Sequence, residues 1–128
     1  MIVDNADEIV HLFQRSFEAQ RFRVTAARNG ETALSAIESN PVDGVVSDFR
    51  MPGMDGNELV TRIRERHPHI PAIIVTAYAN AVPATDDNTE VLSKPVSPLM
   101  LVYRMTEMLI AVDDVRNSKD QGGTSEQS

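Results

Sequence analysis

The sequence predicts an α/β fold of the (βα)5 type, a doubly wound parallel five-stranded sheet with helices on both faces. Two observations predict this class. Short apolar runs alternate along the chain with longer segments whose apolar residues recur at helical spacing. Polar residues follow most of these runs at the point where each run ends. The length of 128 residues suits one domain, which would bury roughly 65–70% of its unfolded surface.

Five segments are predicted to form strands because they are short and apolar and end at turn or polar residues. The segment 72–76, Ala-Ile-Ile-Val-Thr, is apolar almost throughout, which is typical of a strand that is buried on both faces. A turn at Asn29-Gly30 separates the second strand from the helix that follows it. The predicted strands are 1–3, 22–26, 42–47, 72–76 and 89–92.

Helices are predicted where apolar residues share one face. In the first helix, this face contains Ile9, Leu12, Phe13, Ser16 and Phe17. The later helices are predicted at 32–39, 56–66 and 98–115, and prolines mark several of their ends. The segment 77–90 contains Pro83 and no convincing apolar stripe, so the fourth helix is expected to be short or irregular. A polar tail at 117–128 is expected to be disordered.

Composition and charge exclude several classes of function. A net charge of −7 and a pI near 4.8 argue against a nucleic-acid partner bound through a broad basic surface. The absence of cysteine excludes disulfides, zinc-thiolate sites and thiol catalysis. No apolar run is long enough for membrane insertion and no secretion signal begins the chain, so a cytoplasmic location is expected.

Polar side chains with complementary chemistry follow four of the predicted strands. Asp4 and Asn5 come after the first, Asp48 ends the third, Thr76 ends the fourth and Lys94 comes after the fifth. In open parallel sheets, ligands bind outside the carboxyl ends of the strands. We therefore expect these side chains to form one binding site.

Asp48 needs a compensating partner because a carboxylate at the end of a buried strand loses solvation energy. Mg2+ prefers one or two carboxylates together with waters and phosphate oxygens. A phosphoryl group at Asp48 would also meet the Lys94 ammonium and the Thr76 hydroxyl, which suit the charge that spreads over phosphoryl oxygens during transfer. Aspartate is a known nucleophile in such chemistry.

The ordered motifs resemble the receiver domain of two-component response regulators, the chemotaxis-regulator-like family, over roughly residues 1–116. Each motif alone is weak, but their order and spacing together are specific. The segments that carry the resemblance are Val3-Asp4-Asn5, Ala27-Arg28-Asn29-Gly30, Ser47-Asp48-Phe49-Arg50-Met51-Pro52-Gly53-Met54-Asp55-Gly56, Val75-Thr76-Ala77 and Lys94-Pro95.

This resemblance implies a flavodoxin-like strand order, 2-1-3-4-5, and a phosphorelay function. Asp48 would accept phosphate from a histidine kinase or a histidine phosphotransfer protein, with Thr76 as the switch hydroxyl and Lys94 as the phosphate contact. Mg2+ would be held by Asp4, Asn5, Asp48 and the backbone carbonyl of Arg50. The chain would then be a signalling switch that catalyses only its own phosphorylation and hydrolysis, and not a turnover enzyme.

Three departures from the family pattern affect these expectations. Asn5 stands where the family usually has a second acid, so weaker Mg2+ affinity is expected. Val91 replaces an aromatic residue three positions before the lysine, which argues against switching through a rotating ring. The span from Thr76 to Lys94 is shorter than usual, as in receivers that are attached to the kinase portion of a longer hybrid protein.

Several alternatives remain open on the sequence alone. The chain could be a pseudo-receiver, a protein-interaction module that is not phosphorylated, or a phosphatase or flavin-binding protein with the same fold. Asn5 could cap the first helix instead of binding a metal. Arg50 and Tyr78 lie two residues after Asp48 and Thr76, where large side chains would hinder a hydrolytic water.

Overall fold

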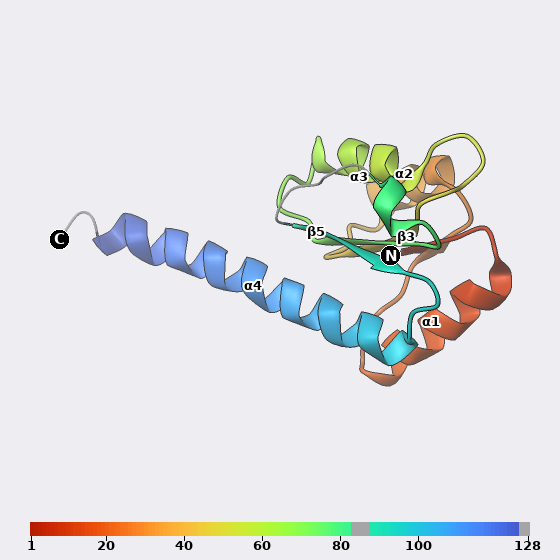
Figure 1. The fold of residues 1–128 in the computed structure, drawn as a ribbon. Helices are drawn as coiled ribbons and strands as arrows, with labels where there is room; N and C mark the ends of the chain where they lie inside the picture. The colour runs from red at the N-terminus through yellow and green to blue at the C-terminus, as the bar shows by residue number, and fades with distance from the viewer. Residues whose placement is uncertain (83–87, 126–128) are drawn as a thin grey trace.

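The computed structural model describes residues 1–82 and 88–125, and its five parallel strands form one sheet between two layers of helices (Figure 1). The strand order is β2-β1-β3-β4-β5, which confirms the predicted topology. The elements in chain order are β1 (Ile2–Val3), α1 (Asp7–Ala19), β2 (Ala26–Ala27), α2 (Gly30–Ser39), β3 (Val45–Asp48), α3 (Gly56–Arg64), β4 (Ala72–Thr76), the 3-10 helix η1 (Ala79–Ala81), β5 (Thr89–Ser93) and α4 (Pro98–Ser125).

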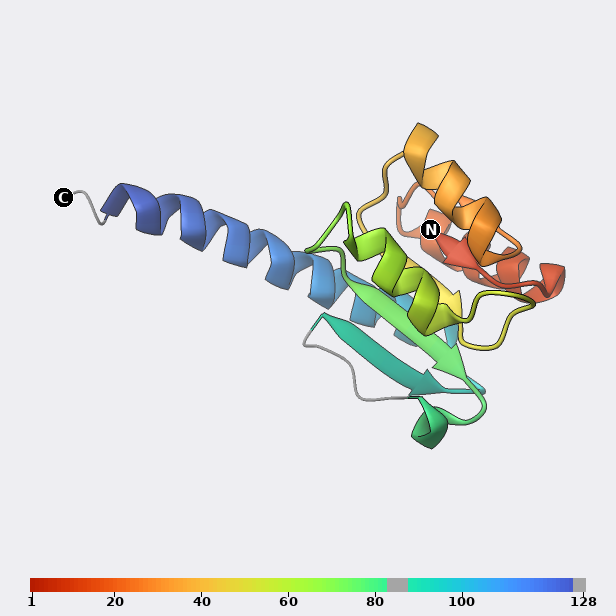
Figure 2. The same cartoon turned by 90° about the horizontal axis from the view of Figure 1, so that it is seen from above.

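Two apolar clusters hold the layers together. α2 and α3 cover one face of the sheet, and α1 and α4 cover the other (Figures 1 and 2). Successive residues of β4 point to opposite faces, so Ile73 packs toward α1 and α4 while Ile74 packs toward α2 and α3. All five residues of β4 are buried, as predicted for this strand. Truncating one such side chain to alanine costs about 2–5 kcal/mol.

Side-chain caps fix where two helices begin. The Asn29 side chain accepts a hydrogen bond from the Thr32 amide at 2.8 Å, so α2 starts at Gly30, earlier than predicted. The Asp55 side chain caps α3 in the same way by accepting from the Glu58 amide at 2.8 Å. Both caps satisfy amides that the first turn of a helix leaves without a backbone partner.

The second strand differs from the prediction most strongly. It was expected at 22–26 but covers only Ala26–Ala27. The reason is that Phe22 packs edge-on against Phe17 of α1, with ring centroids 5.1 Å apart. The expected inward position of Leu12 in the first helix is also wrong, since Leu12 is 48% exposed and Val10 is buried instead.

The described part of the connection from β4 to β5 contains only a short 3-10 helix, in agreement with the expected short or irregular fourth helix. Directly after β4, the chain forms only the short helix η1, and residues 83–87, including Pro83, lie outside the described residues. Within the described ranges, four α-helices are present, fewer than the five of a complete (βα)5 fold.

The last helix is longer than predicted. It was expected to end at residue 115, but α4 continues to Ser125 and extends well beyond the sheet (Figure 1). The backbone of 117–125 is described as helical, 126–128 lie outside the described residues, and the expected disorder of the tail stays a prediction. Polarity alone does not end a helix, because each added residue gains a backbone hydrogen bond once the helix is nucleated. The domain boundary at 116 stays a prediction. None of the described helices combines the length and the apolar character required to cross a membrane.

Candidate functional site

Four strands bring Asp4, Asp48, Thr76 and Lys94 to the carboxyl edge of the sheet. The Lys94 Nζ lies 3.3 Å from the Asp48 Oδ1, and the two side chains are 35% and 12% exposed. Asp4 and Thr76 are buried. The charged pair thus sits at the rim of the sheet, partly exposed to solvent, and Asp4 lies close enough for both charges to shift its pKa.

The sheet itself sets these positions through backbone hydrogen bonds. The Lys94 amide donates to the Thr76 carbonyl at 2.8 Å, and the Phe49 amide, next to Asp48, donates to the Val75 carbonyl at 3.1 Å. These bonds fix the ends of three adjacent strands relative to one another. The site is therefore built on the sheet and not on the loops around it.

Asp4 carries the clearest electrostatic signature of the site. Burial raises the pKa of Asp4 above its ordinary value of 3.8, and a hydrogen bond from the Ala6 amide, at 2.9 Å, lowers it in part. The negative charge of Asp48 raises the pKa further, while Lys94 lowers it. Two carboxylates with a single ammonium leave an excess of negative charge, which a cation would offset.

The oxygen ligands at this site are of the chemical type that Mg2+ prefers. Asp4 and Asp48 supply two carboxylates, and among the described residues no three acidic, histidine or cysteine side chains are grouped to hold a metal. A site with few carboxylates suits Mg2+, which keeps several waters. Asn5 is exposed beside Asp4. The capping role considered for Asn5 is wrong, because the N-cap of α1 is Ala6, without a side-chain cap bond.

The loop after Asp48 approaches the strand closely. A Cβ atom added at Gly56 would lie 2.6 Å from the Asp48 carbonyl oxygen, so only glycine fits at the start of α3. The Ser47 hydroxyl donates to the same oxygen at 2.8 Å. Gly53, with φ of 81°, allows the turn between them. This part of the motif therefore fixes the backbone that carries Asp48.

Arg50 and Tyr78 meet at the outer side of the site. The Arg50 guanidinium carbon lies 5.5 Å from the centroid of the Tyr78 ring, a cation–π distance. The Tyr78 amide also donates to the Thr76 Oγ1 at 3.1 Å. The sequence indicated that both side chains lie near the site, but gave no signal for their contact because it depends on how two separate loops fold.

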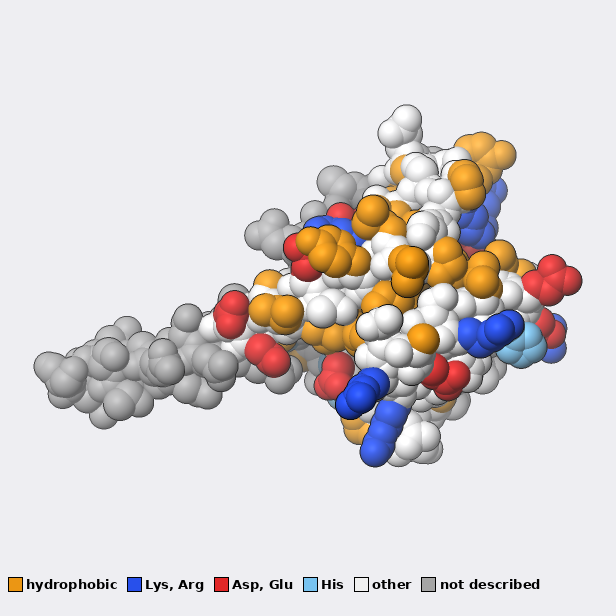
Figure 3. Space-filling view, turned by 90° about the horizontal axis from the view of Figure 1, so that it is seen from below, with side chains coloured by type: hydrophobic (Ala, Val, Ile, Leu, Met, Phe, Trp, Pro, Cys, Tyr) orange, Lys and Arg blue, Asp and Glu red, His pale blue; other side chains and the backbone are white. Residues whose placement is uncertain are grey.

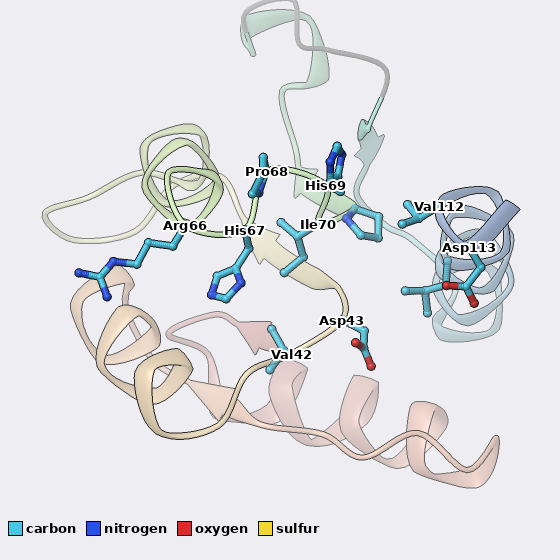
Figure 4. Close-up of a pocket in the computed structure, with 11 residues that line it drawn as sticks. Val42, Asp43, Arg66, His67, Pro68, His69, Ile70, Val112 and Asp113 are labelled. Carbon is cyan, nitrogen blue, oxygen red and sulfur yellow. The ribbon is translucent and has the colours of Figure 1, made fainter. Parts of the chain in front are cut away.

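The opposite, amino end of the sheet contains two cavities that none of the predicted site residues line. One, of about 480 Å3, lies between the α3–β4 loop, the β3 approach and α4. Figure 4 shows His67 pointing toward Val42 there, with Asp43 and Asp113 at the other side. The second, of about 620 Å3, adjoins Val42 and Asp43. Among the described residues, neither cavity holds a group of three or more acidic, histidine or cysteine side chains that could bind a metal.

A sequence profile described as "response regulator receiver domain" matches residues 1–106. The chain belongs to this family. Its predicted membership is thereby confirmed, together with the fold. Receiver domains are signalling modules of two-component systems.

Curated relatives are similar over part of their length. The DNA-binding transcriptional regulator NtrC of Escherichia coli is 38% identical over 79 residues, covering 62% of this chain and 17% of the relative. The response regulator SaeR of Staphylococcus aureus is 33% identical over 117 residues, covering 85% and 49%. The chain thus spans half or less of the length of these relatives.

Solved receiver structures share the fold. The receiver domain of the hybrid histidine kinase CckA matches with a TM-score of 0.74 at 26% identity, covering 84% of this chain and 95% of that one. A putative response regulator of Chloroflexus aurantiacus matches with a TM-score of 0.75 at 29% identity, covering 85% and 94%. NtrX of Brucella abortus, with a TM-score of 0.83 at 22% identity, shows similarity of fold alone; it covers 94% of this chain and 28% of that one.

Proposed function

We propose that this receiver domain takes a phosphoryl group from a histidine kinase or a histidine phosphotransfer protein onto Asp48, with Mg2+ as cofactor. The observation that carries the proposal is the contact of Lys94 with Asp48 beside buried Asp4 and Thr76. The arrangement combines a nucleophilic carboxylate, an ammonium and a hydroxyl at one edge of the sheet. These are the groups that phosphoryl transfer to aspartate requires.

Transfer would proceed by attack of an Asp48 carboxylate oxygen on phosphorus. The bond from phosphorus to the donor's histidine nitrogen breaks, and the imidazole leaves with the electron pair of that bond. Lys94, already 3.3 Å from Asp48, would contact the phosphoryl oxygens, and the Thr76 hydroxyl would donate to one of them. Asp4, Asp48, the Arg50 carbonyl and Asn5 would hold Mg2+, which supplies positive charge toward the same oxygens.

The switch would involve Thr76 and Tyr78. The Thr76 hydroxyl accepts a hydrogen bond from the Tyr78 amide in this structure. Turning that hydroxyl toward a phosphoryl group would break this bond and change the segment that carries exposed Tyr78. Phosphorylation would thereby favour one of two conformations of the β4 and β5 end, and a partner would bind that surface.

The experiment is incubation with a small phosphodonor and Mg2+, followed by mass spectrometry of the intact chain. We expect one phosphoryl group on the wild type and on Asp43→Ala, whose carboxylate is exposed at the amino end, and none on Asp48→Ala. Lack of uptake by the folded wild type would favour the pseudo-receiver. Continued release of phosphate over many turnovers would instead favour an enzyme.

Asn5 sets a second expectation for the same site. With one formal charge fewer than the usual acidic pair, the site should bind Mg2+ weakly, and Asn5→Asp should bind it more tightly. Titration of both forms with Mg2+, followed by thermal unfolding as well as by phosphorylation, measures this. Equal Mg2+ affinities would contradict it.

A further inference from the structure

Ser47 places a polar side chain inside the domain, directly before Asp48 in β3. Its exposed fraction is 0%. Val45 of the same strand belongs to the apolar cluster beneath α2 and α3, so Ser47, two residues later, points to the same side of the sheet. Figure 3 shows the other side of the molecule, which α1 and α4 cover. The Ser47 hydroxyl is therefore enclosed between the end of β3 and the helices above it.

A buried hydroxyl loses its hydration and needs a hydrogen-bond partner to offset that cost. The Ser47 hydroxyl finds one in the next residue, since it donates to the Asp48 carbonyl oxygen at 2.8 Å. An apolar side chain of similar size would need no partner, so stability alone does not explain a hydroxyl at this position. The bond holds the peptide group that follows Asp48.

A second bond closes the base of the loop after Asp48. The Gly56 amide donates to the Phe49 carbonyl at 2.8 Å. The Asp48 and Phe49 carbonyls are thus both held by donors, the first by Ser47 and the second by Gly56. The next carbonyl is that of Arg50, and among the described residues no group donates a hydrogen bond to it. Two fixed peptide groups therefore lead to a carbonyl oxygen that is free to bind a cation.

The packing around Ser47 keeps these peptide groups in place. A Cβ atom added at Gly56 would lie 2.6 Å from the Asp48 carbonyl oxygen and 3.3 Å from the Ser47 Oγ. The hydroxyl thus fills the space between the end of β3 and the first residue of α3. If the hydroxyl were removed, the Asp48 carbonyl would lose its donor and the peptide group would gain room to rotate.

We propose that Ser47 is a positioning residue for Mg2+ binding and phosphoryl transfer, acting through the backbone of Asp48 and Arg50. The role rests on the proposed function, because it concerns the same site. Ser47 is buried under the start of α3 and would touch neither the metal nor the phosphoryl group. Its hydroxyl fixes the backbone that carries two of the proposed oxygen ligands, as outer groups do at many metal sites.

Three substitutions separate the hydroxyl from the volume of the side chain. Ser47→Ala removes the hydroxyl, Ser47→Thr keeps it, and Ser47→Val has the shape of threonine without it. With a small phosphodonor, we expect Ser47→Ala and Ser47→Val to be phosphorylated about tenfold more slowly than the wild type, and to need more Mg2+ for half of their maximal rate. Ser47→Thr should stay within about threefold of the wild-type rate.

Thr61→Val is the matched control. The Thr61 hydroxyl donates to the Asn57 carbonyl at 2.9 Å on the exposed side of α3, so this variant loses a hydroxyl of the same kind and should keep the wild-type rate. Rates are compared under conditions where denaturant unfolding shows every variant to be folded. Equal rates for Ser47→Val and Ser47→Thr would overturn the role of Ser47 and leave phosphorylation of Asp48 untouched.

Hydrogen exchange gives a readout without metal or phosphate. In the metal-free chain, the Phe49 and Gly56 amides, which donate to Val75 and Phe49, should exchange severalfold faster in Ser47→Ala than in the wild type. The Ala33 amide, which donates to Asn29 at the start of α2, should exchange alike in both. Equal exchange of the Phe49 amide would overturn the role of Ser47. A wild type that takes up no phosphoryl group would instead overturn the proposed function, and this role with it.

Discussion

The carboxyl end and the amino end of the sheet differ in the side chains that they would present to a ligand. At the carboxyl end, Asp4, Asp48 and Lys94 converge from separate strands, and the pKa of Asp4 responds to both of the others. At the amino end, two cavities of about 480 and 620 Å3 are lined by none of these three residues. The comparison teaches that the candidate site is marked by charges that converge from separate strands, and not by a cavity.

The first prediction separates the two ends by rate. Lys94→Met should lower the rate of Asp48 phosphorylation by a small donor by about 10- to 100-fold, because the ammonium no longer offsets charge on the phosphoryl oxygens. Arg66→Met, which removes an exposed cation at the amino end, should change this rate less than about twofold. Stopped reactions analysed by mass spectrometry measure both. A similar loss of phosphorylation rate in both variants would show that the carboxyl end has no special role in the reaction.

The second prediction concerns stability at the amino end. The Arg64 guanidinium donates to the Ile70 carbonyl, the Asn88 carbonyl and the Thr89 hydroxyl, at 2.6 to 3.2 Å, and so ties α3 to the starts of β4 and β5. Arg64→Met should lower the free energy of unfolding by about 2–4 kcal/mol, because these carbonyls lose a charged donor. Denaturant unfolding measures this loss.

Arg62→Met provides the control for Arg64. Arg62 pairs at 3.0 Å with Glu58 four residues earlier, and both side chains are about half exposed. Such a pair contributes about 0.3–0.5 kcal/mol. If both variants lost the same stability, the guanidinium contacts of Arg64 would not be what joins the amino ends of these elements.

The sequence predicted the carboxyl end of the sheet better than the amino end. The carboxyl-end convergence of Asp4, Asp48 and Lys94 could be predicted, because parallel strands end at one edge and each residue follows a strand. The roles of these residues stay predictions. β4 could be predicted because its apolar run is uninterrupted. The contacts of Arg64 could not be predicted, because they join residues that are far apart in the sequence and no sequence pattern links them.

The helices show a similar limit. The apolar face of α3 was predicted correctly from its periodicity, with Leu59, Val60 and Ile63 all buried. The bounds of the second strand were not predicted correctly, because Phe22 packs against Phe17 of α1 and does not pair in the sheet. The end of α4 was also missed, since polar composition does not distinguish an exposed helix from a coil.

A third prediction concerns the lifetime of the phosphorylated form. Arg50 and Tyr78, two large side chains that follow Asp48 and Thr76 by two residues, contact each other. Arg50→Asn should therefore speed dephosphorylation severalfold by admitting water to the in-line position. Decay of the phosphorylated chain, followed after removal of the donor, measures it. An unchanged decay rate would remove Arg50 from this role.

The fourth prediction has the smallest effect and concerns pH. Because the pKa of Asp4 is higher in the folded chain than in the unfolded chain, stability falls as pH rises from near 3.8 through the raised value. Asp4→Asn keeps an oxygen for the Ala6 amide but no charge. We expect it to melt a few degrees higher at neutral pH without Mg2+, and the difference should vanish in acid. A lower melting temperature at neutral pH would contradict the assigned cost of burying this carboxylate.

The burial of β4 on both faces has a consequence for local opening of the chain. Its amide hydrogens lie between β3 and β5 and beneath two helical layers, so they should exchange with solvent more slowly than those of the two-residue strand β2 at the edge. Thr76 ends this slowest-exchanging strand. If the loops at the carboxyl edge of the sheet moved, the strand that positions Thr76 would then keep its structure.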